Sequence, residues 1–318
     1  MNTHVASSRL HFCRRLLPSS IALAFVLVAM PAVVHAQVFV ADYGNGTIGE
    51  YTTSGATVNA SLVSGLPNPT DIAVSGSNLF VFNGGTDTIG EYTTAGVPVN
   101  ASLITGLKNG AGMAVSGSNV FVSNYNQFTS TDMVAEYTTS GALVTTWNLL
   151  FPDVAGPIAA SGSNLFVLMN PLTAESYVTE YNFSGVPIRR FSVPGETASI
   201  TVAGNNLFSS AFVRARVGNI VSEYAPSGSL VTSGFASGFS VPANIAVLGS
   251  DVLLTNGSTI GEYTLSGAPV NASFITGLNY ASGIAVVAIP EPPAWALLFG
   301  CITLMFAAAR RFRIKTVA

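Results

Sequence analysis

Apolar residues occur along most of the chain in short runs separated by Gly, Ser, Asn and Thr. One unit of this pattern contains runs at 72–74, 79–82, 88–93 and 97–104. Short runs rich in Val, Ile, Phe, Tyr and Thr, bounded by Gly, Ser and Asn, are typical of β-strands. No stretch shows the helical spacing of apolar positions together with capping residues. The pattern predicts four strands per unit, which we name A to D in chain order.

The unit is repeated, and a Glu-Tyr pair followed by a small residue and glycine marks each copy. The copies begin at Glu50, Glu91, Glu136, Glu180, Glu223 and Glu262, with spacings of 41, 45, 44, 43 and 39 residues. Periods of this length are typical of propeller blades or helical solenoids. Because each unit is β-rich, we predict an all-β fold, a six-bladed β-propeller of four-stranded blades over residues 37–288.

The two ends of this region predict how the ring closes. It begins with a B strand at 38–40 and ends with an A strand at 284–286. The last A strand would therefore complete the first blade and remove the free edge of a linear array.

Residues 1–36 have the features of a secretory signal peptide. Arginines precede an apolar run at 21–34, and small residues stand at Val34 and Ala36. We expect signal peptidase to cut between Ala36 and Gln37. The alternative is a signal anchor that stays uncut.

The C-terminal segment, 289–318, contains a second apolar stretch. Pro290-Glu291-Pro292 precedes uncharged residues at 294–309, and these are followed by Arg310, Arg311 and Arg313. Sixteen residues span about 24 Å as a helix, slightly less than the roughly 30 Å core of a bilayer. Arginines can reach the interface and favour the cytoplasmic side. We predict a transmembrane helix at about 294–309 with the preceding region outside the cytoplasm.

The order of Pro-Glu-Pro, apolar helix and arginine cluster resembles the PEP-CTERM sorting tail of Gram-negative bacteria. The resemblance implies an exosortase as partner, transient anchoring in the inner membrane through the helix, and transfer to the cell surface or exopolysaccharide matrix. An ordinary membrane anchor is the alternative.

Charge and residue content change sharply once these ends are set aside. The whole chain is 49% hydrophobic and 8% charged, whereas a typical soluble domain is roughly a quarter charged. Residues 37–289 hold five cations and fourteen acids, a net charge of −9, and no Cys or His. The acidic balance argues against nucleic acid as a partner. The absence of Cys excludes a disulfide framework, and the absence of His excludes a Ser-His-Asp triad and a His-based zinc site.

The units also resemble NHL-type propeller repeats, most clearly at residues 38–48, Val-Phe-Val-Ala-Asp-Tyr-Gly-Asn-Gly-Thr-Ile. Streptogramin-lyase-like propellers depend on histidine, so that activity does not fit this chain. Propellers host many unrelated functions, so the fold does not settle the activity.

Repeated polar residues have a structural interpretation. Glu and Tyr of each pair point to opposite faces of a strand, so Tyr can pack between blades while Glu caps backbone donors or faces solvent. Asx residues that end the B strands are expected to bond backbone groups in turns; they are Asp42, Asn83, Asn124 and Asn256, with Asn170 one position further along. Ca²⁺ binding by such oxygens is the alternative.

Six-bladed gluconolactonase-type enzymes carry a metal in the central channel. The corresponding positions at the start of the A strands are Asp71, Gly112, Pro157, Ser199, Asn244 and Gly283. This is a thin ligand set, so we expect no metal and no cofactor. The nonrepeated acids Asp132, Asp153, Glu175 and Glu196 belong to no catalytic motif, although glycosidases need only two acids.

Loops that vary between repeats are the best candidates for binding. The B–C loops lengthen in the third, fourth and fifth blades, and four of the five cations fall in the fourth and fifth. We expect a contact sector for an anionic or neutral glycan, or for a surface protein, made of Tyr125, Phe128, Tyr177, Arg189, Arg190, Phe212, Arg214 and Arg216.

The sequence favours a non-catalytic binding or matrix component at the surface or in exopolysaccharide. The alternatives are a Ca²⁺-dependent lactonase-like or carbohydrate-active enzyme, and a purely structural coat protein.

Overall fold

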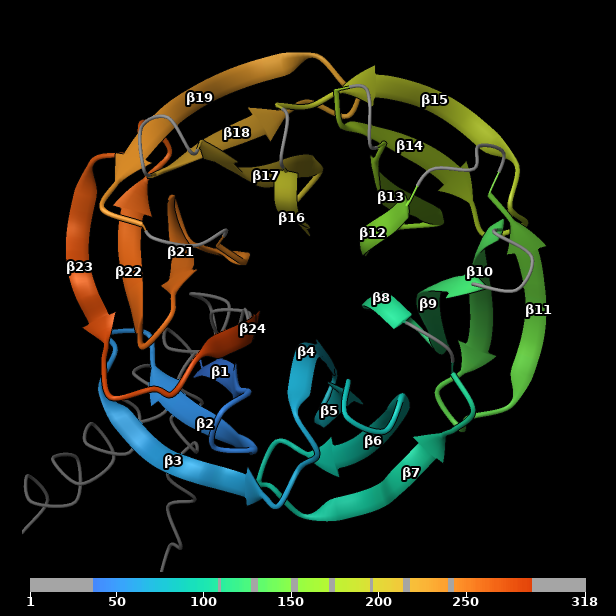
Figure 1. The fold of residues 1–318 in the computed structure, drawn as a ribbon, viewed down its shortest axis with the longest axis horizontal. Helices are drawn as coiled ribbons and strands as arrows, with labels where there is room; N and C mark the ends of the chain where they lie inside the picture. Colours follow the sequence, from blue (N-terminus) through green and yellow to red (C-terminus); the bar gives the residue numbers. More distant parts are fainter. Residues whose placement is uncertain are drawn as a thin grey trace, which may run out of the picture. The chain divides into compact units, whose positions relative to one another are not determined.

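Six four-stranded antiparallel sheets form a β-propeller in the computed structural model (Figure 1). The structure describes residues 37–107, 110–126, 131–149, 154–171, 175–194, 197–213, 218–239 and 243–287. The signal peptide, the Pro-Glu-Pro motif, the 294–309 helix and the arginine cluster expected from the sequence lie outside these residues. Among the described residues, no helix has the length and apolar character needed to cross a membrane.

Blades 1 to 3 follow the expected order of strands. Blade 1 contains β24 (Ala281–Val287), β1 (Gln37–Asp42), β2 (Thr47–Thr52) and β3 (Thr57–Ser64). Blade 2 contains β4 (Pro69–Ser75), β5 (Asn78–Asn83), β6 (Thr88–Thr93) and β7 (Pro98–Ile104). Blade 3 contains β8 (Gly110–Ser116), β9 (Asn119–Asn126), β10 (Thr131–Thr138) and β11 (Leu143–Asn148).

Blades 4 to 6 repeat the pattern. Blade 4 contains β12 (Val154–Ser161), β13 (Asn164–Asn170), β14 (Tyr177–Asn182) and β15 (Pro187–Ser192). Blade 5 contains β16 (Thr197–Ala203), β17 (Asn206–Val213), β18 (Gly218–Tyr224) and β19 (Leu230–Ser237). Blade 6 contains β20 (Ile245–Leu248), β21 (Asp251–Asn256), β22 (Thr259–Thr264) and β23 (Pro269–Ile275).

The predicted closure is confirmed. β24 pairs with β1 in an antiparallel ladder that places Gln37 opposite Val287 and Asp42 opposite Ala281. In Figure 1 the last strand of the chain, β24, lies beside the first, β1, on the inner side of the ring. The chain therefore enters at Gln37 and leaves at Val287 on the face that carries the A–B and C–D turns, opposite the face of the B–C and D–A loops.

The hydrophobic core lies between neighbouring blades. Phe80 and Phe82 of blade 2, for example, pack with Met113 and Val122 of blade 3. The outermost strands reach this core mainly near their ends: residues 98–102 of β7 are all exposed, whereas Ile104 is buried in the core. Among the described residues, the exposed large apolar side chains lie in or next to such outer strands, with Tyr43 and Tyr280 as the exceptions.

The Glu-Tyr pairs contribute to blade packing, as predicted from the sequence. Tyr92 is 5% exposed, and its ring covers Gly90, where an added Cβ would lie 2.9 Å from Tyr92 Cε2. Glu91 points to the other face and is also buried. It accepts a hydrogen bond of 2.7 Å from Asn78 Nδ2 at the start of the B strand. The partner of the glutamate is thus a side-chain amide, and the backbone donor or solvent contact predicted from the sequence is wrong for Glu91.

Candidate functional site

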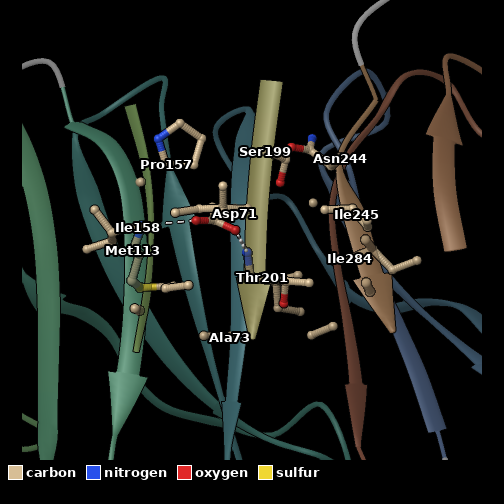
Figure 2. A pocket seen from close by; sticks show the side chains of 18 of the residues that line it. Asp71, Ala73, Met113, Pro157, Ile158, Ser199, Thr201, Asn244, Ile245 and Ile284 are labelled. Atoms are coloured by element: carbon tan, nitrogen blue, oxygen red, sulfur yellow. Dashed lines mark hydrogen bonds between the residues drawn. The ribbon is translucent and has the colours of Figure 1, made fainter. Parts of the chain in front are cut away.

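The six innermost strands surround a central channel of about 1050 Å³. All six positions that the sequence placed at the start of the A strands line it: Asp71, Gly112, Pro157, Ser199, Asn244 and Gly283. Further along the strands the lining becomes apolar, with side chains such as Met113 and Ile245 (Figure 2). The polar groups thus concentrate toward the end of the channel that carries the B–C and D–A loops.

Asp71 projects into this channel from β4, and both of its carboxylate oxygens accept backbone hydrogen bonds (Figure 2). Oδ1 accepts from Ile72 N–H at 2.8 Å, in its own strand. Oδ2 accepts from Met113 N–H at 3.0 Å, in β8 of the next blade. The carboxylate therefore joins two blades.

Burial raises the pKa of the Asp71 carboxyl to about 6, and the two backbone N–H groups oppose this shift only in part. Desolvation disfavours the charged form of a carboxyl group, whereas hydrogen bonds donated to it favour that form. Asp71 is surrounded by protein but keeps some surface toward the channel. Perturbed carboxyls in a cavity are candidates for chemistry, although structural groups show the same shift.

Comparable polar links occur at every junction between blades. Each joins a side chain of one blade to the backbone of the next: Ser282 to Pro69 O, Asp71 to Met113 N, Ser123 to Gly156 O, Asn170 to Thr197 O, Ser210 to Ala243 O and Asn244 to Ser282 O. Buried backbone groups need a hydrogen-bond partner, and these side chains provide one at each junction. Asp71 is the carboxylate member of this set.

Four of the five Asx residues, Asp42, Asn124, Asn170 and Asn256, bond backbone groups through their side chains. Asn83 Oδ1 is buried without a hydrogen-bond partner among the described residues, and Asn124 lies inside its strand because β9 continues to Asn126. Asn256 donates to Gly238 O at 3.1 Å, and Asn124 donates to Val122 O at 3.3 Å. Asp42 accepts from Asn45 N–H and Asn279 N–H. These contacts support the structural interpretation. The described residues contain no group of three or more His, Cys, Asp or Glu side chains that could hold a metal ion.

The expected contact sector is divided in the structure. Arg190 lies over the ring of Tyr177, with its guanidinium carbon 3.3 Å from the ring centroid, and Tyr177 is 2% exposed. Arg189 lies on the outer strand β15, where it pairs with Glu180 at 2.5 Å and donates to Pro226 O in the next blade. These arginines thus contact the protein itself.

The remaining members of that sector are placed only in part. Phe212 is half-buried and packs against the core between blades 5 and 6. Tyr125 belongs to β9, opposite Asp132 in the ladder. Phe128, Arg214 and Arg216 lie outside the described residues, so their role as ligand contacts stays a prediction.

A pair of exposed tyrosines at the joint of the ring was not identified from the sequence. The rings of Tyr43 and Tyr280 meet edge to face, with centroids 6.0 Å apart. Both residues lie in loops of blade 1, directly after β1 and directly before β24. Alignment of the repeats would have provided a signal, because Gly84 and Asn68 hold the same positions in blade 2.

No family model matches the chain, and no curated protein matches it. Solved structures match through their fold. A chain from a nidogen/laminin complex has 12% identity and a TM-score of 0.61, covering 80% of this chain and 98% of that one. A Bacteroides caccae protein of unknown function has 12% identity and a TM-score of 0.58, covering 80% of this chain and 100% of that one.

An enzyme is among the similar structures. A gluconolactonase from Xanthomonas campestris has 15% identity and a TM-score of 0.53, covering 69% of this chain and 79% of that one. At such identities the likeness shows the β-propeller fold alone. A fold of this kind carries many activities, so the function must be argued from this chain's own residues.

Proposed function

We propose that the protein is an exported, non-catalytic binding component of the cell surface or exopolysaccharide matrix. In this proposal signal peptidase removes residues 1–36, and the tail at 289–318 is a PEP-CTERM signal read by an exosortase. The propeller is then the part that remains outside the cell.

The arrangement of Asp71 is the observation that carries the binding role over catalysis. Its two oxygens are engaged by backbone N–H groups of two blades. A general base needs an oxygen within reach of the proton that it removes. Here each oxygen accepts a backbone N–H, and the bond from Met113 holds the ring together, as the serine and asparagine links do at the other junctions. A structural role therefore accounts for Asp71 without chemistry.

The direction of the chain ends supports anchoring by the tail. Gln37 and Val287 are paired at one end of β1 and β24. The B–C and D–A loops lie at the other end of these strands. A tail that holds the protein at a membrane or surface through Val287 therefore leaves the variable loops accessible to partners.

Cell fractionation of the full-length protein tests the sorting proposal. The wild type is expected in the surface or matrix fraction, in a shorter form that lacks the C-terminal tail. A variant with Pro290, Glu291 and Pro292 changed to Ala is expected to stay full-length in the membrane fraction. Recovery of both proteins uncut in the membrane would contradict the proposal, and a variant with Pro269→Ala, in the propeller, is the matched control.

A lactonase-like enzyme is the second candidate. The raised pKa of Asp71 in a channel of a fold shared with a gluconolactonase favours it. Titration of acid released from a sugar lactone, with and without added Ca²⁺, separates the two functions. Turnover that is lost in Asp71→Asn while the protein stays folded would establish the enzyme, and no turnover by the folded wild type would support the binding role.

A further inference from the structure

We propose that Tyr43 and Tyr280 form a binding platform for a neutral glycan at the joint where the propeller closes. This inference rests on the proposed binding function and names its ligand class and site. Four observations carry it: the exposure of the two rings, the strained backbone of Tyr280, the contrast with blade 2, and the polar groups beside the rings.

The two rings are exposed in a place where the fold does not need them. Tyr43 is 39% exposed and Tyr280 is 51% exposed. Their edge-to-face contact, with an interplanar angle of 71°, leaves aromatic surface open to solvent. Exposed aromatic side chains are enriched at recognition sites because they offer large contact areas at low conformational cost.

The backbone of Tyr280 has a φ of +76°. Positive φ is tolerated by Gly, Asn and Asp, but it is a genuine outlier for a bulky residue. The other described non-glycine residues with positive φ are Asn68 and Asp87. Strain of this kind is concentrated at ligand sites, so an aromatic ring at this position points to a role outside folding.

Blade 2 contains the same loop without the aromatic pair. Tyr43 N–H donates to Tyr280 O at 3.0 Å, and Gly84 N–H donates to Asn68 O at 2.9 Å. The next residues match as well, since Gly44 N–H donates to Asn279 O and Gly85 N–H donates to Pro67 O. The backbone contacts are thus conserved within the chain when Gly84 and Asn68 replace the two tyrosines. Neither ring is required to build this joint.

Polar groups beside the rings are held by a hydrogen-bond network. Asp42 Oδ2 accepts from Asn45 Nδ2 and from Asn279 N–H, both at 2.9 Å. Asn279 Nδ2 donates to Asn45 Oδ1 at 3.3 Å. Asn45 and Asn279 are exposed, so each still presents amide groups to a ligand. The amides beside the rings are therefore held in place before a ligand arrives, which lowers the entropic cost of binding.

These features select a sugar without charge. The face of an aromatic ring is negative and attracts the C–H groups of a saccharide ring, while the amide groups of Asn45 and Asn279 exchange hydrogen bonds with hydroxyls. The charged side chain that the network holds is Asp42, and residues 37–289 have a net charge of −9. Both repel uronic acids and phosphates.

Titration calorimetry with the full-length protein in detergent tests the platform. The probes are neutral hexasaccharides of glucose, xylose and mannose, with a hexasaccharide of glucuronic acid as the charged arm. At least one neutral probe is expected to bind, and the paired variant Tyr43→Gly/Tyr280→Asn, which reproduces blade 2, is expected to bind it at least tenfold more weakly. The matched control Asn68→Ala is expected to bind as the wild type does.

Conservative variants separate the role of the rings from that of their hydroxyls. Tyr43→Phe and Tyr280→Phe are expected to keep binding within threefold of the wild type. Three results would overturn the platform: no neutral probe binds the folded protein, the paired variant binds as well as the wild type, or only the glucuronic probe binds. Because sorting is measured separately by fractionation, a failure here leaves the proposed export and surface role standing.

Discussion

The carboxylate of Asp71 accepts a hydrogen bond from Met113 N–H across the junction between blades 2 and 3. Forty-two residues separate the two positions, which is about one repeat. This contact makes Asp71 a structural link between the blades. Burial at the same position makes the carboxyl costly to ionise.

The free energy of unfolding is expected to decrease as the pH rises from about 4 to about 6, because of Asp71. The folded state keeps the proton up to about pH 6, whereas the unfolded chain loses it near 3.8. Between these values the folded state binds more protons, so raising the pH favours unfolding. The shift corresponds to roughly 2–3 kcal/mol of unfolding free energy. Urea denaturation of the wild type at pH 4 and pH 7 measures it.

Asp71→Asn is the control for this pH dependence. Burial also raises the pKa of Glu50, Glu136 and Glu262, so both proteins share that background. As the pH rises, the wild type should lose more unfolding free energy than the variant does, because residue 71 does not titrate in the variant. A constant difference from pH 4 to pH 7 would show that Asp71 does not titrate in this range.

Removal of one inter-blade hydroxyl is expected to weaken the ring. Ser123 is fully buried, and its Oγ donates to Gly156 O at 2.8 Å. Ser123→Ala should lower the free energy of unfolding by about 1–3 kcal/mol because the carbonyl is left without its partner. Ser54→Ala removes an exposed turn hydroxyl and should change it by less than about 0.5 kcal/mol. Equal effects of the two changes in chemical denaturation would refute the role of the junction.

The contact between Gly90 and Tyr92 is open to a double-mutant cycle. A Cβ at Gly90 would also lie 3.0 Å from Ala101 O. Gly90→Ala should therefore destabilise the protein by about 1–3 kcal/mol. In a Tyr92→Leu background the cost should shrink, giving a coupling energy of about 0.5–3 kcal/mol. Additive effects in thermal or urea unfolding would mean that the ring does not restrict residue 90.

Strain at Tyr280 predicts a stabilising substitution. Tyr280→Asn should raise the free energy of unfolding by about 1 kcal/mol, because Asn tolerates the left-handed conformation better. The mirror change Asn68→Tyr, at a φ of +55°, should lower it by a similar amount. If Tyr280→Asn destabilised the protein as much as Asn68→Tyr does, the ring would have a folding role.

Much of the fold could be predicted from the sequence because the repeats report it six times. Thr88–Thr93 was expected as a strand and is one, and the pairing of β24 with β1 follows from a chain that begins on a B strand and ends on an A strand. The six positions predicted at the start of the A strands likewise line the central channel.

The binding surface could be predicted less well, because loops lack the period that identifies strands. Arg189 and Tyr177 are close in sequence to variable loops, yet one pairs with Glu180 and the other lies beneath Arg190. The position of Tyr43 against Tyr280 depends on contact between the two ends of the propeller, 237 residues apart. Only the closed ring brings them together.

The central claim, that this propeller binds glycan outside the cell without chemistry, is tested most directly by sedimentation with exopolysaccharide from the producing cells. Wild type and Asp71→Asn should co-sediment equally with the polysaccharide. For Tyr43→Gly/Tyr280→Asn, the fraction of protein left in the supernatant should be at least tenfold larger than for the wild type. The sugar composition and chain length of the polysaccharide should stay unchanged. Shortening of the polysaccharide that depends on Asp71, or equal sedimentation of all three proteins, would contradict the account.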